Sequence, residues 1–145
     1  MIFELTAAAA LAATTDDAPN WRDPPDCWDG PQSELTHCAW AEYHQADREM
    51  NEQWERTVAL MKRLDTEYPP VPAIGQSSYF EALLAGQRAW LEFRDEHCPI
   101  YAAGGGSMAP ELEGICLRDI TRQRTSMLVR LMLNPATGHP FFEDQ

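Results

Sequence analysis

One long helical pattern dominates the first half of the chain. From about Glu34 to Tyr68, large apolar side chains recur mostly at spacings of three and four residues, which is typical of one face of an α-helix. Three prolines, at positions 69, 70 and 72, end the pattern because proline cannot continue a helix. The apolar stripe comprises Trp40, Tyr43, Met50, Trp54, Val58, Met61, Leu64 and Tyr68, and the faces between carry Glu42, Arg48, Glu49, Glu52, Glu55, Arg56 and Arg63 as an expected solvated surface.

Two further helical patterns follow. The second runs from about Tyr79 to Cys98, with Ser77 or Ser78 as its cap, and the third starts near Pro110 and ends before Asn134. No residue run alternates as a strand would, and short connections favour antiparallel neighbours. We therefore predict an all-α fold, an antiparallel helical hairpin plus a third packed helix. The expected apolar face of the third helix comprises Leu112, Ile115, Cys116, Ile120, Met127, Leu128 and Leu131.

The two ends of the chain do not continue these patterns. Residues 2–13 are largely apolar, and Ala10-Leu11-Ala12 fits the small-x-small site of an export signal. We therefore predict a signal peptide over 1–12, a linker over 13–26, a helical domain over 27–133 and a tail over 134–145. The alternative for the first segment is a helix of the folded domain. No run reaches the roughly 18 apolar residues of a membrane span.

Four cysteines, at positions 27, 38, 98 and 116, are an even number in a small chain with an expected export signal, and this combination favours disulfide bonds. Three pairings are possible. We predict Cys27–Cys38 and Cys98–Cys116 because these close short local loops. The chain has no Cys-x-x-Cys pair, and its four histidines are poorly spaced for metal binding. We therefore expect no metal and no cofactor.

Two charged residues occupy positions where the helical period demands burial, Asp47 in the first stripe and Arg94 in the second. In an antiparallel hairpin these residues lie within about one or two helical turns of each other. Because a buried charge is costly unless it is paired, we predict a buried or half-buried Asp47–Arg94 pair that fixes the register of the helices. The alternative is a catalytic or ligand-binding carboxylate.

The composition argues against several classes of function. The formal net charge is −12, which disfavours nucleic acid and anionic lipid and favours a basic protein partner. The chain contains no nucleophile elbow, phosphate loop or catalytic triad pattern. We therefore expect a protein that is not an enzyme.

The combined pattern resembles the lysozyme inhibitor LprI family over about residues 27–130. The four cysteines carry the resemblance, together with Ala46 to Asn51, the run Gln87-x-x-Trp90-x-x-x-Arg94-Asp95-x-x-Cys98, Gly105 to Ser107, and Thr121 to Arg124 before Leu128.

The resemblance implies a periplasmic or secreted helical domain with local disulfides, and inhibition of lysozyme. Our candidate binding loop comprises Gly104, Gly105, Gly106, Ser107 and Met108, because a Cys98–Cys116 bond would hold its ends. A loop of that kind could enter the cleft of a lysozyme and exclude substrate. The simpler alternative for the loop is a plain connector, and the alternative function is a cell-envelope binding module with another protein or glycan partner.

Overall fold

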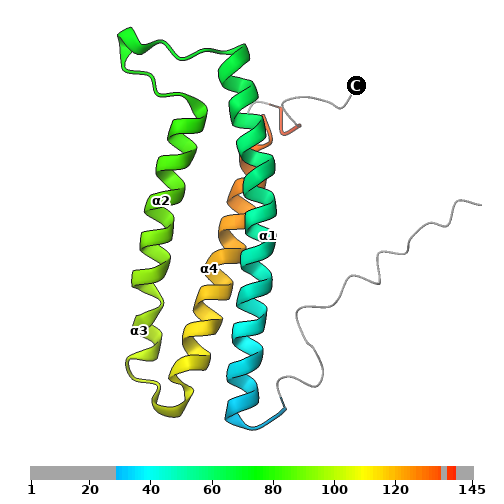
Figure 1. Ribbon diagram of the computed structural model, residues 1–145, viewed down its shortest axis with the longest axis vertical. Helices are drawn as coiled ribbons and strands as arrows, with labels where there is room; N and C mark the ends of the chain where they lie inside the picture. The colour runs from blue at the N-terminus through cyan, green and yellow to red at the C-terminus, as the bar shows by residue number, and fades with distance from the viewer. Residues whose placement is uncertain (1–28, 135–136, 140–145) are drawn as a thin grey trace, which may run out of the picture.

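The computed structural model describes residues 29–134 and 137–139, and within them it is helical without a β-strand. The described residues form three long helices, α1 (Gln32–Glu67), α2 (Tyr79–His97) and α4 (Ala109–Leu131) (Figure 1). They are joined by three short elements, η2 (Pro72–Ile74), α3 (Pro99–Ala102) and η3 (Gly106–Met108). The prediction of an all-α fold is confirmed for these residues. The predicted signal peptide, the linker, Cys27 and most of the C-terminal tail lie outside them.

The three long helices run up, down and up, so that α2 is antiparallel to both α1 and α4 (Figure 1). The predicted hairpin of α1 and α2 is present, but α1 packs most extensively against α4. Small residues explain this close approach. A Cβ atom added to Gly114 would lie 3.1 Å from the Cβ of Ala39, so α4 meets α1 through a position that has no side chain.

The first residue of α2 is set by a local side-chain cap, whereas α1 begins without one. Ser78 caps α2 as predicted, since its hydroxyl accepts a hydrogen bond from the amide of Glu81, whose carboxylate in turn accepts one from the Ser78 amide. The long helix begins at Gln32, two residues before the predicted Glu34, with Pro31 at the N-cap and no side-chain cap.

The buried face of α4 differs in part from the predicted one. Cys116 and Leu128 are buried as expected, but Met127 and Leu131 are exposed. Leu117 and Thr121, which were not in the expected set, are buried. The difference arises because α4 packs most extensively against α1, whereas the expected set was chosen from apolar character alone.

The core is divided into two clusters along the bundle. One surrounds Cys98, Cys116 and Leu117, at the end where α2 connects to α4. The other contains Met50, Met61, Leu64, Leu83 and Leu128, toward the end with the prolines. We call residues 29–47 and 92–119 the disulfide half, and residues 48–91 and 120–134 the proline half. In the described part of the chain, no helix is both long and apolar enough to cross a membrane.

Candidate protein-binding surface

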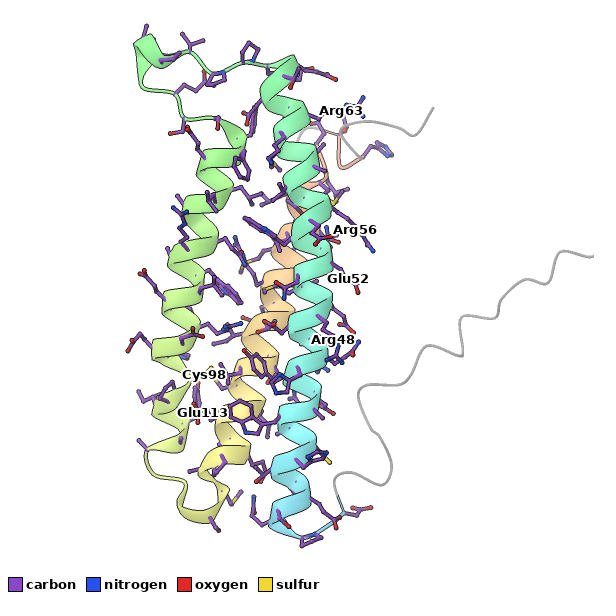
Figure 2. The ribbon with its side chains drawn as sticks, viewed as in Figure 1. Arg48, Glu52, Arg56, Arg63, Cys98 and Glu113 are labelled. Atoms are coloured by element: carbon purple, nitrogen blue, oxygen red, sulfur yellow. A yellow bond between two sulfur atoms is a disulfide. The ribbon has the colours of Figure 1, made fainter. Side chains whose placement is uncertain are left out.

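The disulfide bond Cys98–Cys116 joins the residue that follows α2 to the first half of α4, with a Cα–Cα distance of 5.5 Å. Both cysteines are buried, and Trp40, Tyr43 and Ile120 pack against their cluster. Figure 2 labels Cys98 near the lower end of the bundle. The bond is one of the two predicted. The other, Cys27–Cys38, involves a cysteine outside the described residues and stays a prediction.

The segment between the two cysteines contains two short helical elements, α3 and the 3-10 turn η3, and its backbone needs glycine at two positions. A Cβ atom on Gly105 would lie 2.8 Å from the Cα of Ala109, and Gly106 has a φ angle of +54°. The candidate loop residues Gly104 to Met108 therefore form a compact tip at the end of the bundle.

Three rings form a stacked row beside this tip, which we call the aromatic ladder: Phe93, His97 and Tyr101. The centroids of Phe93 and His97 are 5.0 Å apart in a stacked arrangement, and those of His97 and Tyr101 are 5.6 Å apart edge to face. Phe93 and Tyr101 are each about half exposed. The ladder borders a groove of about 390 Å³ between α2 and α4, and Ile100 and Met108 add exposed apolar surface nearby.

The structure brings the predicted partners Asp47 and Arg94 together. The Nη1 atom of Arg94 donates to Oδ1 of Asp47 at 3.2 Å and its Nε donates to Asp95 at 2.8 Å. Burial alone would lower the pKa of Arg94, but the hydrogen bond to Asp95, the nearby Tyr43 hydroxyl and the hydrogen bond to Asp47 raise it. The guanidinium also lies over the rings of Tyr43 and Trp90. Arg94 thus joins α1 to α2 as a charged group with a carboxylate partner on each helix.

A second interhelical ion pair was missed from the sequence. Arg118 of α4 donates to Glu42 of α1 at 2.6 Å and to Asp119 at 2.7 Å, and only 17% of the Arg118 side chain and 12% of that of Glu42 are exposed. The sequence pattern placed Glu42 on the solvated face of α1, and this was wrong because Arg118 of α4 covers it. The other charges expected on that surface are exposed, and Figure 2 shows Arg48, Glu52, Arg56 and Arg63 on the side of α1 away from α2.

Charge is unevenly divided between the two halves. The disulfide half contains ten acidic residues and two basic ones, Arg94 and Arg118, and both of these arginines are already paired. The proline half contains six acidic and eight basic residues. Most of the negative charge of the described residues therefore lies in the disulfide half, which also contains the tip and the aromatic ladder.

The described residues do not gather a metal site, since no group of three or more His, Cys, Asp or Glu side chains among them could hold an ion. The arrangement that does stand out is an exposed apolar and aromatic surface in acidic surroundings, on a backbone fixed by a disulfide. Such a surface suits recognition of another molecule.

Comparison with known proteins agrees with this picture. The family model described as "Lysozyme inhibitor LprI" matches residues 27–128. An uncharacterized protein of Rhizobium meliloti (strain 1021) is 37% identical over 129 residues, which cover 87% of this chain and 92% of that protein. No solved structure gives a significant match. The residues matched by the family model include both cysteines of the observed disulfide, the Asp47–Arg94 pair and the tip, and the chain belongs to the lysozyme inhibitor LprI family.

Proposed function

We propose that the protein is an exported inhibitor that binds lysozyme through the tip and the aromatic ladder. Membership of the LprI family supports inhibition as the activity. A disulfide bond buried in a small domain supports export, because such bonds persist in oxidising compartments outside the cytoplasm. The predicted signal at residues 1–12 is consistent with a periplasmic or secreted location.

The observation that carries the proposal is the exposed ladder in acidic surroundings. Aromatic side chains dominate the energetics of protein interfaces because they bury a large area at a small entropy cost. Phe93 and Tyr101 already have their backbones fixed, the first in α2 and the second in α3. Many lysozymes are strongly basic, and the acidic disulfide half would attract them and orient the ladder toward them.

The tip gives the proposal a mechanism. Lysozymes cleave glycosidic bonds with two carboxyl groups in an open cleft. A rigid segment that enters this cleft would exclude the glycan, and a segment whose ends are already joined loses little conformational entropy on binding. We assign this role to Gly104 to Met108, which the Cys98–Cys116 bond holds at its base.

Titration of the purified protein into cell-wall lysis assays with several lysozyme classes tests the activity. We expect inhibition at micromolar protein or below. Tyr101→Ala should weaken inhibition about tenfold or more if the ladder is an interface anchor. Tyr68→Ala is the matched control, since Tyr68 is similarly exposed but lies at the other end of the bundle. Equal losses in both variants, or none in either, would contradict the assigned surface.

Ionic strength tests the electrostatic part separately. Association steered by opposite charges slows as salt screens them. We expect the association rate with a basic lysozyme to fall between about 50 and 500 mM salt, while the dissociation rate changes less. A rate that does not respond to salt would remove charge steering from the proposal and leave the ladder as the sole determinant.

A glycan-binding module is the second candidate, because exposed rings such as Phe93 and Tyr101 can also stack on sugars. The two candidates differ in what they bind. An inhibitor binds lysozyme in the absence of cell wall, whereas a glycan-binding module sediments with purified peptidoglycan in the absence of lysozyme. Peptidoglycan binding that is lost in Tyr101→Ala, without inhibition of any lysozyme, would favour the second.

A further inference from the structure

A second groove lies in the proline half, between α2 and α4, and the proposed function does not use it. It has a volume of about 490 Å³, which is within the range of sites for small molecules. Buried Met61, Leu64 and Leu83 line it together with partly exposed apolar residues. Its remaining wall includes Arg124 and Arg130 of α4, so the groove is an apolar trough edged by positive charge.

Arg124 differs from Arg94 and Arg118, which join the helices through ion pairs. Arg94 and Arg118 each have carboxylate partners on two sides. Arg124 has none among the described residues, and its Nε donates to the neutral side chain of Gln87 at 2.9 Å. Its guanidinium also lies 5.9 Å from the Trp90 ring centroid. The remaining donors of Arg124, on its two Nη atoms, therefore have no acceptor in the part of the chain that the structure describes.

The electrostatics of Arg124 agree with this difference. Burial lowers the pKa of its guanidinium, and no neighbouring acid counters the effect. The same burial is outweighed by acidic partners at Arg94 and Arg118, whose pKa values are raised. Arg130, the other cation of the groove, also has no ion-pair partner among the described residues. In a chain of net charge −12, this groove thus has two arginines that form no ion pair with a described acidic residue.

Gly86 is the second independent feature of the groove. It lies inside α2, where glycine destabilises a helix relative to alanine. Packing does not require glycine there, since a Cβ atom would meet only the Nη2 atom of Arg124, at 4.0 Å. Gly114, by contrast, is required by its contact with α1. The missing side chain at position 86 leaves the groove open directly beside the Arg124 guanidinium.

We propose that this groove binds a single-chain amphiphile with an anionic head, whose apolar chain lies along Met61, Leu64 and Leu83 while the head accepts hydrogen bonds from Arg124. The chemistry of the lining supports this class of ligand. A planar guanidinium whose Nη donors have no acceptor among the described residues matches a carboxylate or phosphate group. The apolar trough matches a hydrocarbon chain. Arg130 adds a second positive charge at the edge. The site is independent of the lysozyme-binding surface.

Calorimetric titration of the full chain with dodecanoate, below its critical micelle concentration, tests the proposal. We expect saturable binding of one dodecanoate per chain. Dodecyl phosphate should also bind, and the tighter of the two identifies the preferred head. Dodecyltrimethylammonium has the same chain with a cationic head, and it should bind at least about tenfold more weakly, as expected when a charged hydrogen bond is lost.

Two variants test separately how the anionic head and the hydrocarbon chain of the amphiphile contribute to binding. Arg124→Gln removes the cation and should weaken dodecanoate binding about tenfold or more. Arg88→Gln is the matched control, because Arg88 is an exposed arginine of α2 that does not line the groove. Gly86→Leu fills the groove from within a helix that tolerates the change, and it should abolish binding while the melting temperature stays equal or rises. Circular dichroism verifies the fold of each variant.

Several results would overturn the proposal. Absence of dodecanoate and dodecyl phosphate binding would do so, as would equal binding of the cationic amphiphile or unchanged binding in both Arg124→Gln and Gly86→Leu. If dodecanoate fails to bind and Gly86→Leu instead changes the size of the protein in solution, the groove is an interface between two copies. If the full chain fails to bind dodecanoate but a chain shortened to residue 139 binds it, the C-terminal segment occupies the groove in place of a ligand.

Discussion

The two halves of the bundle are built from the same three helices but are held together differently. In the disulfide half, a covalent bond, two interhelical ion pairs and a glycine contact fix the helices closely. In the proline half, the contacts are mainly apolar, around Met50, Leu64 and Leu128, and an open groove remains between α2 and α4. The first half presents a rigid acidic surface, and the second offers an apolar trough edged by arginines.

This difference indicates which half can bind a protein partner and which half can bind a small apolar ligand. A protein interface benefits from exposed side chains on a backbone that does not have to be ordered on binding, and the constraints of the disulfide half provide this. A small apolar ligand needs an unfilled space with few polar partners, and the groove of the proline half provides one. One short domain can therefore hold two separate sites without a conflict between them.

Removal of the disulfide is the largest change that we expect. The double variant Cys98→Ser, Cys116→Ser opens a loop of 19 residues and should lower the free energy of unfolding by about 3 kcal/mol. Urea unfolding with the wild type as reference measures this. Inhibition of lysozyme should fall as well, while dodecanoate binding in the remaining folded protein should persist. Loss of both activities in equal measure would show that the halves are not independent.

Removal of the buried cations should have the next largest effect. Arg118→Met leaves Glu42 uncompensated and almost buried, and we expect a loss of about 2 kcal/mol. Arg94→Met leaves Asp47 uncompensated, but 34% of that side chain is exposed to water, so about 1 kcal/mol should be lost. Chemical denaturation gives both values. A larger loss in Arg94→Met would contradict the role that we give to solvent exposure.

Gly114→Ala should destabilise the protein by about 1 kcal/mol. The added Cβ atom would lie 3.1 Å from the Cβ of Ala39 and 3.2 Å from Cδ1 of Trp40, and the cost of overpacking should exceed the gain in helix propensity. The shift of the urea midpoint measures this. An unchanged or raised midpoint would mean that α1 and α4 separate easily, and it would contradict the close packing that we describe for the disulfide half.

Gly86→Ala is the counterpart in the proline half, and it should stabilise the protein by a few tenths of a kcal/mol up to about 1 kcal/mol. No packed atom opposes the added methyl group. The same thermal and urea measurements as for Gly114→Ala give a direct contrast of two glycines in the same bundle. A loss of stability at position 86 would indicate that the groove closes in solution.

The sequence predicted the helices well because their signals are local. The apolar period of α1, the prolines after it and the Ser78 capping box act within a few residues, and the cysteine spacing indicated the bond that the structure contains. The Asp47–Arg94 pair could also be anticipated, because each residue interrupts its own apolar stripe and the hairpin sets their relative heights.

What the sequence could not determine is which faces meet, and this depends on contacts between residues far apart in the chain. Glu42 and Arg118 interrupt no apolar stripe, so only the close packing of α1 on α4 revealed that they form a pair. The same packing decides that Leu117 and Thr121 are buried while Met127 is exposed. It also leaves α2 farther from α4, which creates the groove beside Gly86 and Arg124. Local periodicity fixes where a helix forms, whereas the size of the side chains at each crossing decides how closely two helices approach and what space is left between them.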